Sequence, residues 1–434
     1  MATRRLSKFD HQGFEELVSI VRDADVAMSN LEVLLHDFEG YPAAHGPGTY
    51  MRAPPWVADE LSWMGFDLVA AATNHSFDYS HGGMEATMRE LETRELPYAG
   101  LGRNLTAARE PAYVDTSGGR CGLVAACSTI TTGSEAGEPR NGLSGRPGIS
   151  PLRYNVRYQM PPTHVETLRE ISKELGLEAR KEHQADLGFP IEPPDGDQFR
   201  FFTVGGDTHP EITEADVFGV ERVPDDDDVT AIARQITEAD RQADLVVASL
   251  HYHEGKGANA TDKTIPAFVE RFARDCIDAG ADAFVGHGSH TLRGIELYEG
   301  APIFYSLGNF VAQNDLVERL PIEMYKRYGL DADATPADVF DARSTDEDGA
   351  SRGFAAYPEY YETVLPVCEY AGEDLSSITL YPIDLLRTEP RPRRGRPTIA
   401  DKETGEEILS RLQRLSDPYG TTLEIADGIA TATV

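Results

Sequence analysis

Lysine is scarce in this chain of 434 residues: seven lysines stand beside 33 arginines, against 73 aspartates and glutamates. The resulting formal charge of −33 would repel phosphate groups, so we expect neither nucleic acid nor an anionic membrane as a partner. Abundant acidic residues with few lysines suit a cytosol of high salt, where counterions screen the self-repulsion. We therefore hypothesise a halophilic source.

Long apolar runs and paired cysteines are also missing. No apolar stretch approaches the roughly 20 residues that a membrane-spanning helix needs, and the segment MATRRLSKFDHQ has no signal-peptide core. The four cysteines (Cys121, Cys127, Cys276 and Cys368) have no CxxC spacing, which favours buried thiols over disulfides or a metal site. We expect a protein without a membrane span that is cytoplasmic, on the sequence as it stands.

The chain does contain a regular alternation of amphipathic stretches and short apolar runs. Residues 14–32 predict a helix followed by a strand. The runs FDLVAAA, DLVVASL and ADAFVG are also predicted strands, and each is preceded by a predicted helix. Later strands are predicted at APIFYSLGN, YYETVLPVCEY and SITLYPIDLL, then a helix over residues 402–420 and a last strand over residues 421–434. This alternation predicts an α+β or layered α/β fold.

The chain is predicted to form a single domain over residues 1–434. Its core would comprise residues 14–130, 223–312 and 359–434, and residues 313–358 would be irregular. Residues 131–222 are polar and rich in proline and glycine, with one helix predicted over residues 163–183. Long excursions of this kind are often binding loops, so we expect an insertion over the active-site edge of the sheet.

Polar residues follow four of the predicted strands directly. Their patterns are Asn-x-Glu, Asn-His, His-x-His and His-x-x-His, and the residues are Glu32, Asn74, His75, His251, His253, His287 and His290. Open sheets bind ligands at the carboxyl ends of their strands. Imidazole and carboxylate groups suit Mn, Fe or Zn, so we expect one or more divalent metal ions there, able to activate water. For any one histidine alone, an exposed or capped loop position remains the alternative.

A Gly-Asp-x-His motif at residues 206–209 is a weaker candidate for a metal site, because it lies within the insertion.

In this order the segments resemble the CapA-type capsule synthesis family, which is associated with poly-γ-glutamate synthesis and related to calcineurin-like metallophosphatases. The matching blocks include ADVAMSNLE, LVAAATNHSFDY, ADLVVASLHYHEG, GADAFVGHGSH and FYSLGNF. The resemblance implies a four-layer αββα sandwich. It places metal-site positions on Glu32, Asn74, His75, His251, His287 and His290.

Proteins of this family usually begin with a strand that ends in Gly-Asp, whose aspartate holds a metal in the related phosphatases. Here Met1 is followed directly by ATRRLSKFD, the kind of segment expected just after that motif. On this resemblance, either the start site is assigned too late or the chain lacks the first strand and one ligand.

We therefore expect a metal-dependent hydrolase or transferase that acts on a small-molecule or polyglutamate-type substrate. The expected metal ligands are Glu32, Asn74, His75, His251 and His287, and the expected catalytic residues are His290, His253 and Asn74. Two alternatives stay open: a non-catalytic accessory subunit of a polymer-synthesis complex, and a nucleotidase-like phosphoesterase unrelated to capsule polymer.

Overall fold

The computed structural model describes residues 2–46, 48–189, 199–201, 211–255, 264–331 and 333–433. The chain forms two compact units. The first comprises Met1–Pro151, Ala231–His253 and Ala273–Val434, and the second comprises Leu152–Thr230 and Glu254–Phe272. Among the helices that the structure describes, none combines the length and the apolar character needed to cross a bilayer.

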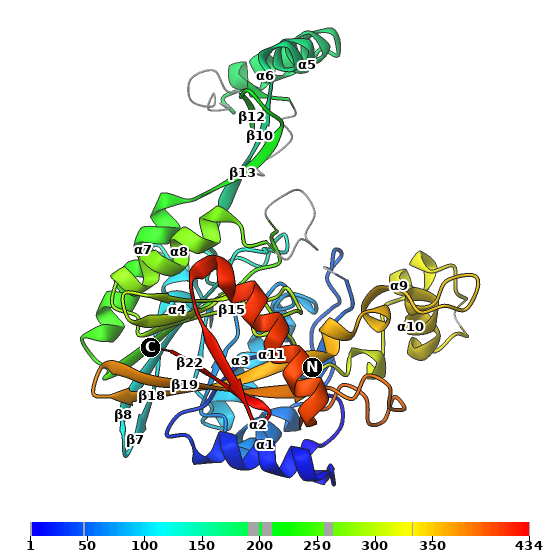
Figure 1. Cartoon of the computed structure of the whole chain (residues 1–434). Helices are drawn as coiled ribbons and strands as arrows, with labels where there is room; N and C mark the ends of the chain where they lie inside the picture. Colours follow the sequence, from blue (N-terminus) through cyan, green and yellow to red (C-terminus); the bar gives the residue numbers. More distant parts are fainter. Residues whose placement is uncertain are drawn as a thin grey trace. The chain divides into compact units, whose positions relative to one another are not determined.

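A six-stranded sheet is the largest sheet of the first unit (Figure 1). Its spatial order is β16 (Ile295–Tyr298), β17 (Ala301–Phe304), β15 (Ala283–His287), β14 (Leu245–His251), β8 (Gly119–Cys127) and β7 (Ala112–Thr116). The four inner strands are parallel to one another, and the two edge strands are antiparallel to their neighbours. Four strands therefore direct their carboxyl ends to the same edge of the sheet.

Two smaller sheets pack on one face of the six-stranded sheet. One contains the parallel strands β1 (Met28–Asn30), β4 (Leu68–Ala70) and β5 (Tyr98–Ala99). The other contains the antiparallel strands β18 (Glu362–Ala371), β19 (Asp374–Asp384), β22 (Ile429–Ala432) and β21 (Leu423–Ala426), with β20 (Thr398–Ile399) beside β19. Leu68 and Ala99 pack against Leu123 of β8, while Val364 of β18 packs in one cluster with Val285 of β15.

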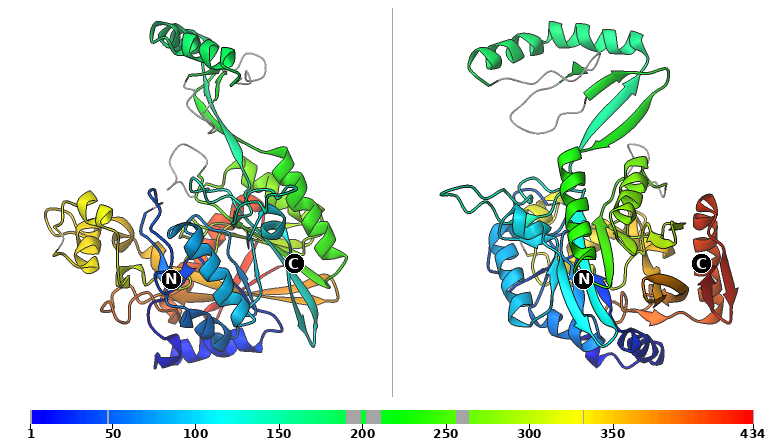
Figure 2. Two further views of the ribbon diagram at one scale, coloured as in Figure 1. Left: turned by 180° about the vertical axis from the view of Figure 1, so that it is seen from behind. Right: turned by 90° about the vertical axis from the view of Figure 1, so that its left-hand side faces the viewer.

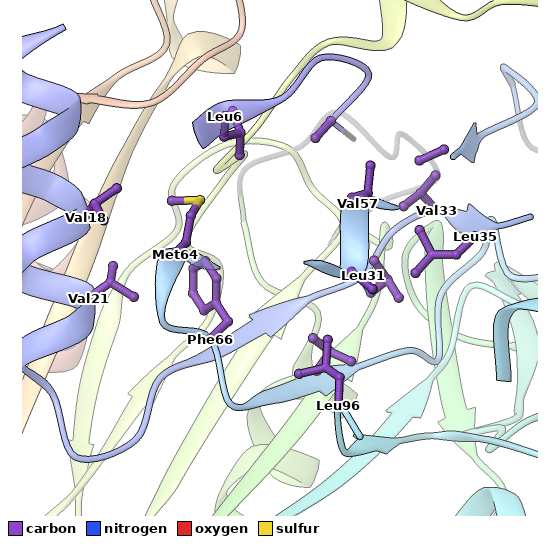
Figure 3. Packing of buried hydrophobic residues seen from close by; sticks show 14 of the residues in the cluster. Leu6, Val18, Val21, Leu31, Val33, Leu35, Val57, Met64, Phe66 and Leu96 are labelled. Atoms are coloured by element: carbon purple, nitrogen blue, oxygen red, sulfur yellow. The ribbon is translucent and has the colours of Figure 1, made fainter. Parts of the chain in front are cut away.

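Helices cover the outer faces of these sheets. The residues Phe14, Leu17, Val18 and Val21 repeat at helical spacing, so α1 (Gln12–Asp23) buries one apolar side with α2 (Trp56–Met64). Figure 3 shows Val18 and Val21 of α1 on the side toward Leu6, Met64 and Phe66. Further helices are α3 (Ser80–Thr93), α4 (Leu105–Arg109), α7 (Asp226–Asp240), α8 (Ala267–Asp278), α9 (Ile322–Arg327), α10 (Pro336–Ser344) and α11 (Lys402–Ser416). The parts of α7 and α8 that belong to the first unit, from Ala231 and from Ala273 onward, lie along the six-stranded sheet (Figures 1 and 2).

The second unit contains a four-stranded sheet and a pair of helices. The sheet has the order β11 (Phe199–Arg200), β12 (Glu211–Glu214), β10 (Tyr154–Met160) and β13 (Gly219–Pro224), and the helices are α5 (Pro162–Glu174) and α6 (Leu177–Asp186). The single helix predicted over residues 163–183 is therefore wrong. Gly176 adopts a left-handed conformation with φ of 73°, which ends one helix before the next begins.

Most elements predicted for the first unit are confirmed. The helix and strand within residues 14–32 correspond to α1 and β1, and the runs at residues 360–370 and 377–386 correspond to β18 and β19. The last strand predicted over residues 421–434 is instead the hairpin of β21 and β22. It turns at Asp427 and Gly428, which both have positive φ.

Candidate metal centre

The predicted polar residues come together because their strands are parallel neighbours. His251 and His287 are register partners at the ends of β14 and β15, and Asn30 of β1 is the register partner of Ala70 of β4. Glu32 follows β1 by two residues, and Asn74 lies four residues after the end of β4. Each strand therefore delivers its polar residues to one edge of the two packed sheets.

Glu32, His253 and His290 form a compact group of possible ligands. Their ligand atoms all lie within 4.8 Å of one another. The Oε1 atom of Glu32 is 3.7 Å from Nε2 of His251 and 4.0 Å from Nε2 of His290. This oxygen is buried and has no hydrogen-bond partner among the described residues. A carboxylate oxygen facing several imidazole nitrogens at this spacing is a suitable position for a cation.

His251 has more neighbours than one tautomer can satisfy. Its Nε2 atom lies 3.0 Å from Oδ1 of Asn74 and 3.2 Å from Nε2 of His253, while its Nδ1 atom is buried without a described partner. If Nε2 carries the proton and donates to Asn74, then Nδ1 is left as an unpaired acceptor. If Nδ1 carries the proton, then this buried donor has no described partner, and the lone pair of Nε2 faces the acceptor Oδ1 of Asn74. A cation bound between Nε2 and Oδ1 would remove the repulsion between these two acceptors.

His75 is held by a buried carboxylate. Its Nδ1 atom donates to Oδ2 of Asp78 over 2.7 Å, and the same oxygen accepts the N–H of Met51 over 2.5 Å. Burial lowers the pKa of His75, but the charge and hydrogen bond of Asp78 outweigh burial, so the pKa is raised. This pairing fixes the ring and leaves Nε2 as the nitrogen for another partner, an arrangement common among metal-binding histidines.

His290 is oriented by Asn309. The Nδ2 atom of Asn309 donates to the carbonyl of Tyr360 over 2.9 Å, so its Oδ1 atom faces Nδ1 of His290, 2.9 Å away. An amide oxygen only accepts, so Nδ1 of His290 carries the proton and Nε2 presents a lone pair toward Glu32. The position of the ring also depends on the backbone, because His290 has a left-handed φ of 59°.

The glycine that separates His287 from Ser289 is required by close packing. Gly288 has φ of 107°, and a Cβ atom there would lie 2.5 Å from the carbonyl oxygen of Tyr252. The loop after β15 can therefore turn tightly against the residues that follow β14 only with glycine at this position.

Three imidazoles of this cluster, those of His251, His253 and His287, are neutral at neutral pH, whereas Asp78 raises the pKa of His75. Burial and then the neighbouring histidines hold the pKa of His251 well below its ordinary value, and burial and then His290 do the same for His253. Burial alone lowers the pKa of His287 to about 4, and its Nε2 atom has no described hydrogen-bond partner. Neutral imidazole is the form that binds metal ions, so the donor set fits a divalent cation.

The structure places all seven predicted residues in or beside this group. Glu32, His251, His253 and His290 lie within direct reach of one another, Asn74 borders His251, and His75 and His287 act electrostatically on His251. Which of them bind metal stays a prediction. The Gly-Asp-x-His motif at residues 206–209 lies outside the described residues.

Sequence reasoning missed three neighbours of the cluster. Asn309 ends the predicted strand APIFYSLGN, so its place after a strand was an available signal. Phe354 lies with its ring centroid 5.0 Å from that of His290, and Tyr360 stacks on Phe354 at 4.3 Å. Phe354 lies within residues 313–358, which were predicted to be irregular but contain α9 and α10, and Tyr360 begins the predicted strand YYETVLPVCEY. The two rings form an apolar border to the centre that no pattern predicted.

The chain is similar to known proteins over most of its length. A family model described as "Bacterial capsule synthesis protein PGA_cap" matches residues 5–314, a range that includes every candidate residue from Glu32 to His290. The protein y4sH of Sinorhizobium fredii is 35% identical over 437 residues, covering 99% of this chain and 90% of y4sH. The capsule biosynthesis protein CapA of Bacillus anthracis is 24% identical over 301 residues, covering 69% of this chain and 53% of CapA. A probable polyglutamine synthesis accessory protein of Mycobacterium tuberculosis is 25% identical over 287 residues, covering 66% of this chain and 55% of that protein.

Proposed function

Because this chain belongs to the family of bacterial capsule synthesis proteins, we propose that it is a metal-dependent hydrolase or transferase of poly-γ-glutamate or capsule biosynthesis. We further propose a four-layer αββα arrangement of the metallophosphatase type for its first unit. Two packed layers of sheet with helices against them support this arrangement.

The observation that carries the catalytic proposal is the convergence of one carboxylate on several neutral imidazoles. Glu32 presents a buried oxygen without a described hydrogen-bond partner to His251 and His290, and burial keeps His251, His253 and His287 unprotonated. A divalent ion bound there would supply Lewis acidity and hydroxide near neutral pH. The side chains themselves would bind and orient the substrate around the ion.

The nearby polar groups suit two roles toward a substrate. With Oδ1 of Asn74 facing His251, its Nδ2 atom is left to donate to a phosphoryl or acyl oxygen. His253 and His290 each have a ligand atom within 4.8 Å of Glu32, so each is either a metal ligand or the group that moves a proton. Asp78 would act through His75 by fixing its orientation.

Metal content and turnover together test this proposal. Purified protein is analysed for Mn, Fe and Zn and assayed with a panel of phosphoesters and γ-glutamyl amides, before and after His75→Ala and His253→Ala. We expect stoichiometric metal with turnover, both reduced in His75→Ala and unchanged in His45→Ala, where an exposed histidine is the matched control. If His253 binds metal, His253→Ala loses metal as well as turnover; if it moves protons, only turnover falls. Full turnover in metal-free protein would contradict the proposal.

A non-catalytic accessory role is the second candidate. The Mycobacterium tuberculosis relative bears the name of a synthesis accessory protein, and a chain with a formal charge of −33 repels a polyanionic substrate. Protein that is well folded and has neither bound metal nor turnover would favour this role.

A further inference from the structure

A large cavity lies between the two smaller sheets of the first unit. Its volume is about 1090 Å³, and residues of β1 and β18 line its two long sides. At one end it reaches His287, His290 and Asn309, and at the other it reaches Gly118, Gly372 and their neighbours. The cavity therefore extends along these strands from the candidate metal centre to the opposite edge of the sheets.

Both strands beside this cavity are sheet edges. Among the described residues, β1 pairs only with β4, and β18 pairs only with β19. The two edges run in opposite directions, since β1 leads toward Glu32 while β18 starts at Glu362 beside Leu307, whose carbonyl accepts a hydrogen bond from Thr363. Any single strand placed between them would therefore be parallel to one and antiparallel to the other.

The cavity lies at the edges of β1 and β18, in the plane of the two smaller sheets, rather than on a face of either sheet. Along β18, Val364 packs toward the six-stranded sheet and Leu365 toward α1 and α2, yet both line the cavity. Met28 and Ala27 at β1 show the same division. Alternate residues of a strand point to opposite faces, so a space that reaches both sets lies at the strand edge, where a neighbouring strand would pair.

Apolar side chains close the cavity on its two remaining sides. Leu123, Val247 and Val285 of the six-stranded sheet form one wall, and Val21, Met64 and Phe66, which are labelled in Figure 3, form the other. Between Thr363 and Cys368 the edge strand β18 carries no charged residue, whereas exposed edge strands are commonly protected by charges. Strands buried on both faces are nearly continuous in apolar residues, and β18 has this composition.

We propose that this cavity is the binding site of one extended, apolar polypeptide strand, which pairs with β1 and β18 and joins the two smaller sheets into one. Such a strand would take hydrogen bonds from two edges at once, the mode known as β-augmentation. Pro366 has no N–H to offer, so bonds to β18 would come from the residues on either side of it. The Oδ1 atom of Asn30, buried in the cavity wall without a described partner, would gain a donor.

The ends of the cavity differ in charge, which helps to design a peptide. Asp244, Asp282 and Glu373 line the end far from the histidines. A lysine flank on the peptide would be attracted to this acidic end and would also keep an apolar strand soluble. The proposal depends on strand edges alone and would stand even if the centre bound no metal.

Hydrogen exchange with a synthetic peptide tests the proposal. The probe is a nine-residue Val/Ile/Ala peptide with a lysine flank, added to the full chain. The matched control peptide has the same side chains but is N-methylated at every residue, which removes its backbone donors toward both edges. We expect slower amide exchange in both β1 and β18, approaching about 100-fold at a peptide concentration 100 times Kd. The edge strand β7 should not change, and the N-methylated peptide should have no effect.

A variant that fills the cavity provides a second measurement. Val247→Trp places a larger apolar side chain into the space, so we expect an unchanged or higher melting temperature and loss of peptide binding. If this variant unfolds, the exchange experiment on the unaltered protein still tests whether the peptide pairs with β1 and β18. Protection of only one of the two strands would overturn the proposal, as would equal binding of the N-methylated peptide. Binding of decanoate in place of the peptide would also overturn it and assign the cavity to an acyl chain.

Discussion

His36 should make the folded protein sensitive to mild acid. Its side chain is fully buried, the ring of Tyr79 lies 4.5 Å away between centroids, and neither ring nitrogen has a hydrogen-bond partner among the described residues. Burial, reinforced by the positive charge of Arg52, lowers the pKa of His36 from 6.5 to about 4. The imidazole therefore stays neutral in the folded protein under conditions that protonate it in the unfolded chain.

The sign and size of the effect follow from this difference. Between pH 6.5 and about 4 the unfolded chain binds one more proton at His36 than the folded protein, so the free energy of unfolding falls as the pH falls. A lowering from 6.5 to about 4 is about 2.5 units, which at about 1.36 kcal/mol per unit corresponds to about 3 kcal/mol over the whole window. About 2 kcal/mol of this is lost by pH 5.

Urea unfolding of the protein and of His36→Leu at pH 7, 6 and 5 measures this loss. EDTA is present throughout, so that metal binding does not contribute. Other histidines also favour acid unfolding, so the comparison is between the two pH slopes. We expect the unaltered protein to lose about 2 kcal/mol more than His36→Leu between pH 7 and pH 5. The exposed control His45→Leu should retain the full slope. Parallel curves for His36→Leu and the unaltered protein would refute the reasoning.

Three further predictions concern the centre and the charge of the chain. Asn309→Ala removes the acceptor that sets the tautomer of His290, so metal affinity measured by calorimetry should fall about 10- to 100-fold; an unchanged affinity would show that Asn309 does not orient the ring. Gly286→Ala places a Cβ atom 2.2 Å from the carbonyl oxygen of Tyr305, so urea unfolding should show a loss of about 1–3 kcal/mol, and no loss would mean that the strands can separate freely. With a formal charge of −33, the protein should unfold in dilute buffer and recover in molar KCl, as followed by circular dichroism, and indifference to salt would oppose a halophilic source.

The sequence was most informative where one local pattern determines the result. Apolar runs that stop at Asn, His or Glu predicted the ends of β1, β4, β14 and β15, and parallel pairing brings those ends together. The prediction succeeded because the carboxyl ends of parallel strands meet at one edge. For each of these four strands, the local order of residues was sufficient to identify the polar residues that lie at the shared edge.

The orientation of individual rings could not be predicted in this way. The proton on His290 is placed by Asn309, which is itself held by the carbonyl of Tyr360, a residue 70 positions beyond His290 in the short 3-10 helix Pro358–Tyr361. The division of the predicted 163–183 helix was also missed, because its polar periodicity continues across Gly176. Contacts between distant segments and backbone conformations at single glycines leave little trace in a hydrophobic pattern.

The strand cavity and the metal centre meet at Glu32 and His290, so the residue at that end of a bound strand should change metal affinity. A strand parallel to β1 would bring its carboxyl end there, as β4, β14 and β15 do. With both peptides amidated at the carboxyl end, one that ends in Gly-Asp would add a carboxylate oxygen to a group that has one carboxylate, whereas the matched peptide that ends in Gly-Asn adds no charge. Calorimetry with Mn²⁺ should therefore show tighter binding with the Gly-Asp peptide alone. Equal metal affinity with the two peptides would mean that the strand ends short of the centre or enters in the opposite direction, and the histidines with Glu32 would then have to hold the ion by themselves.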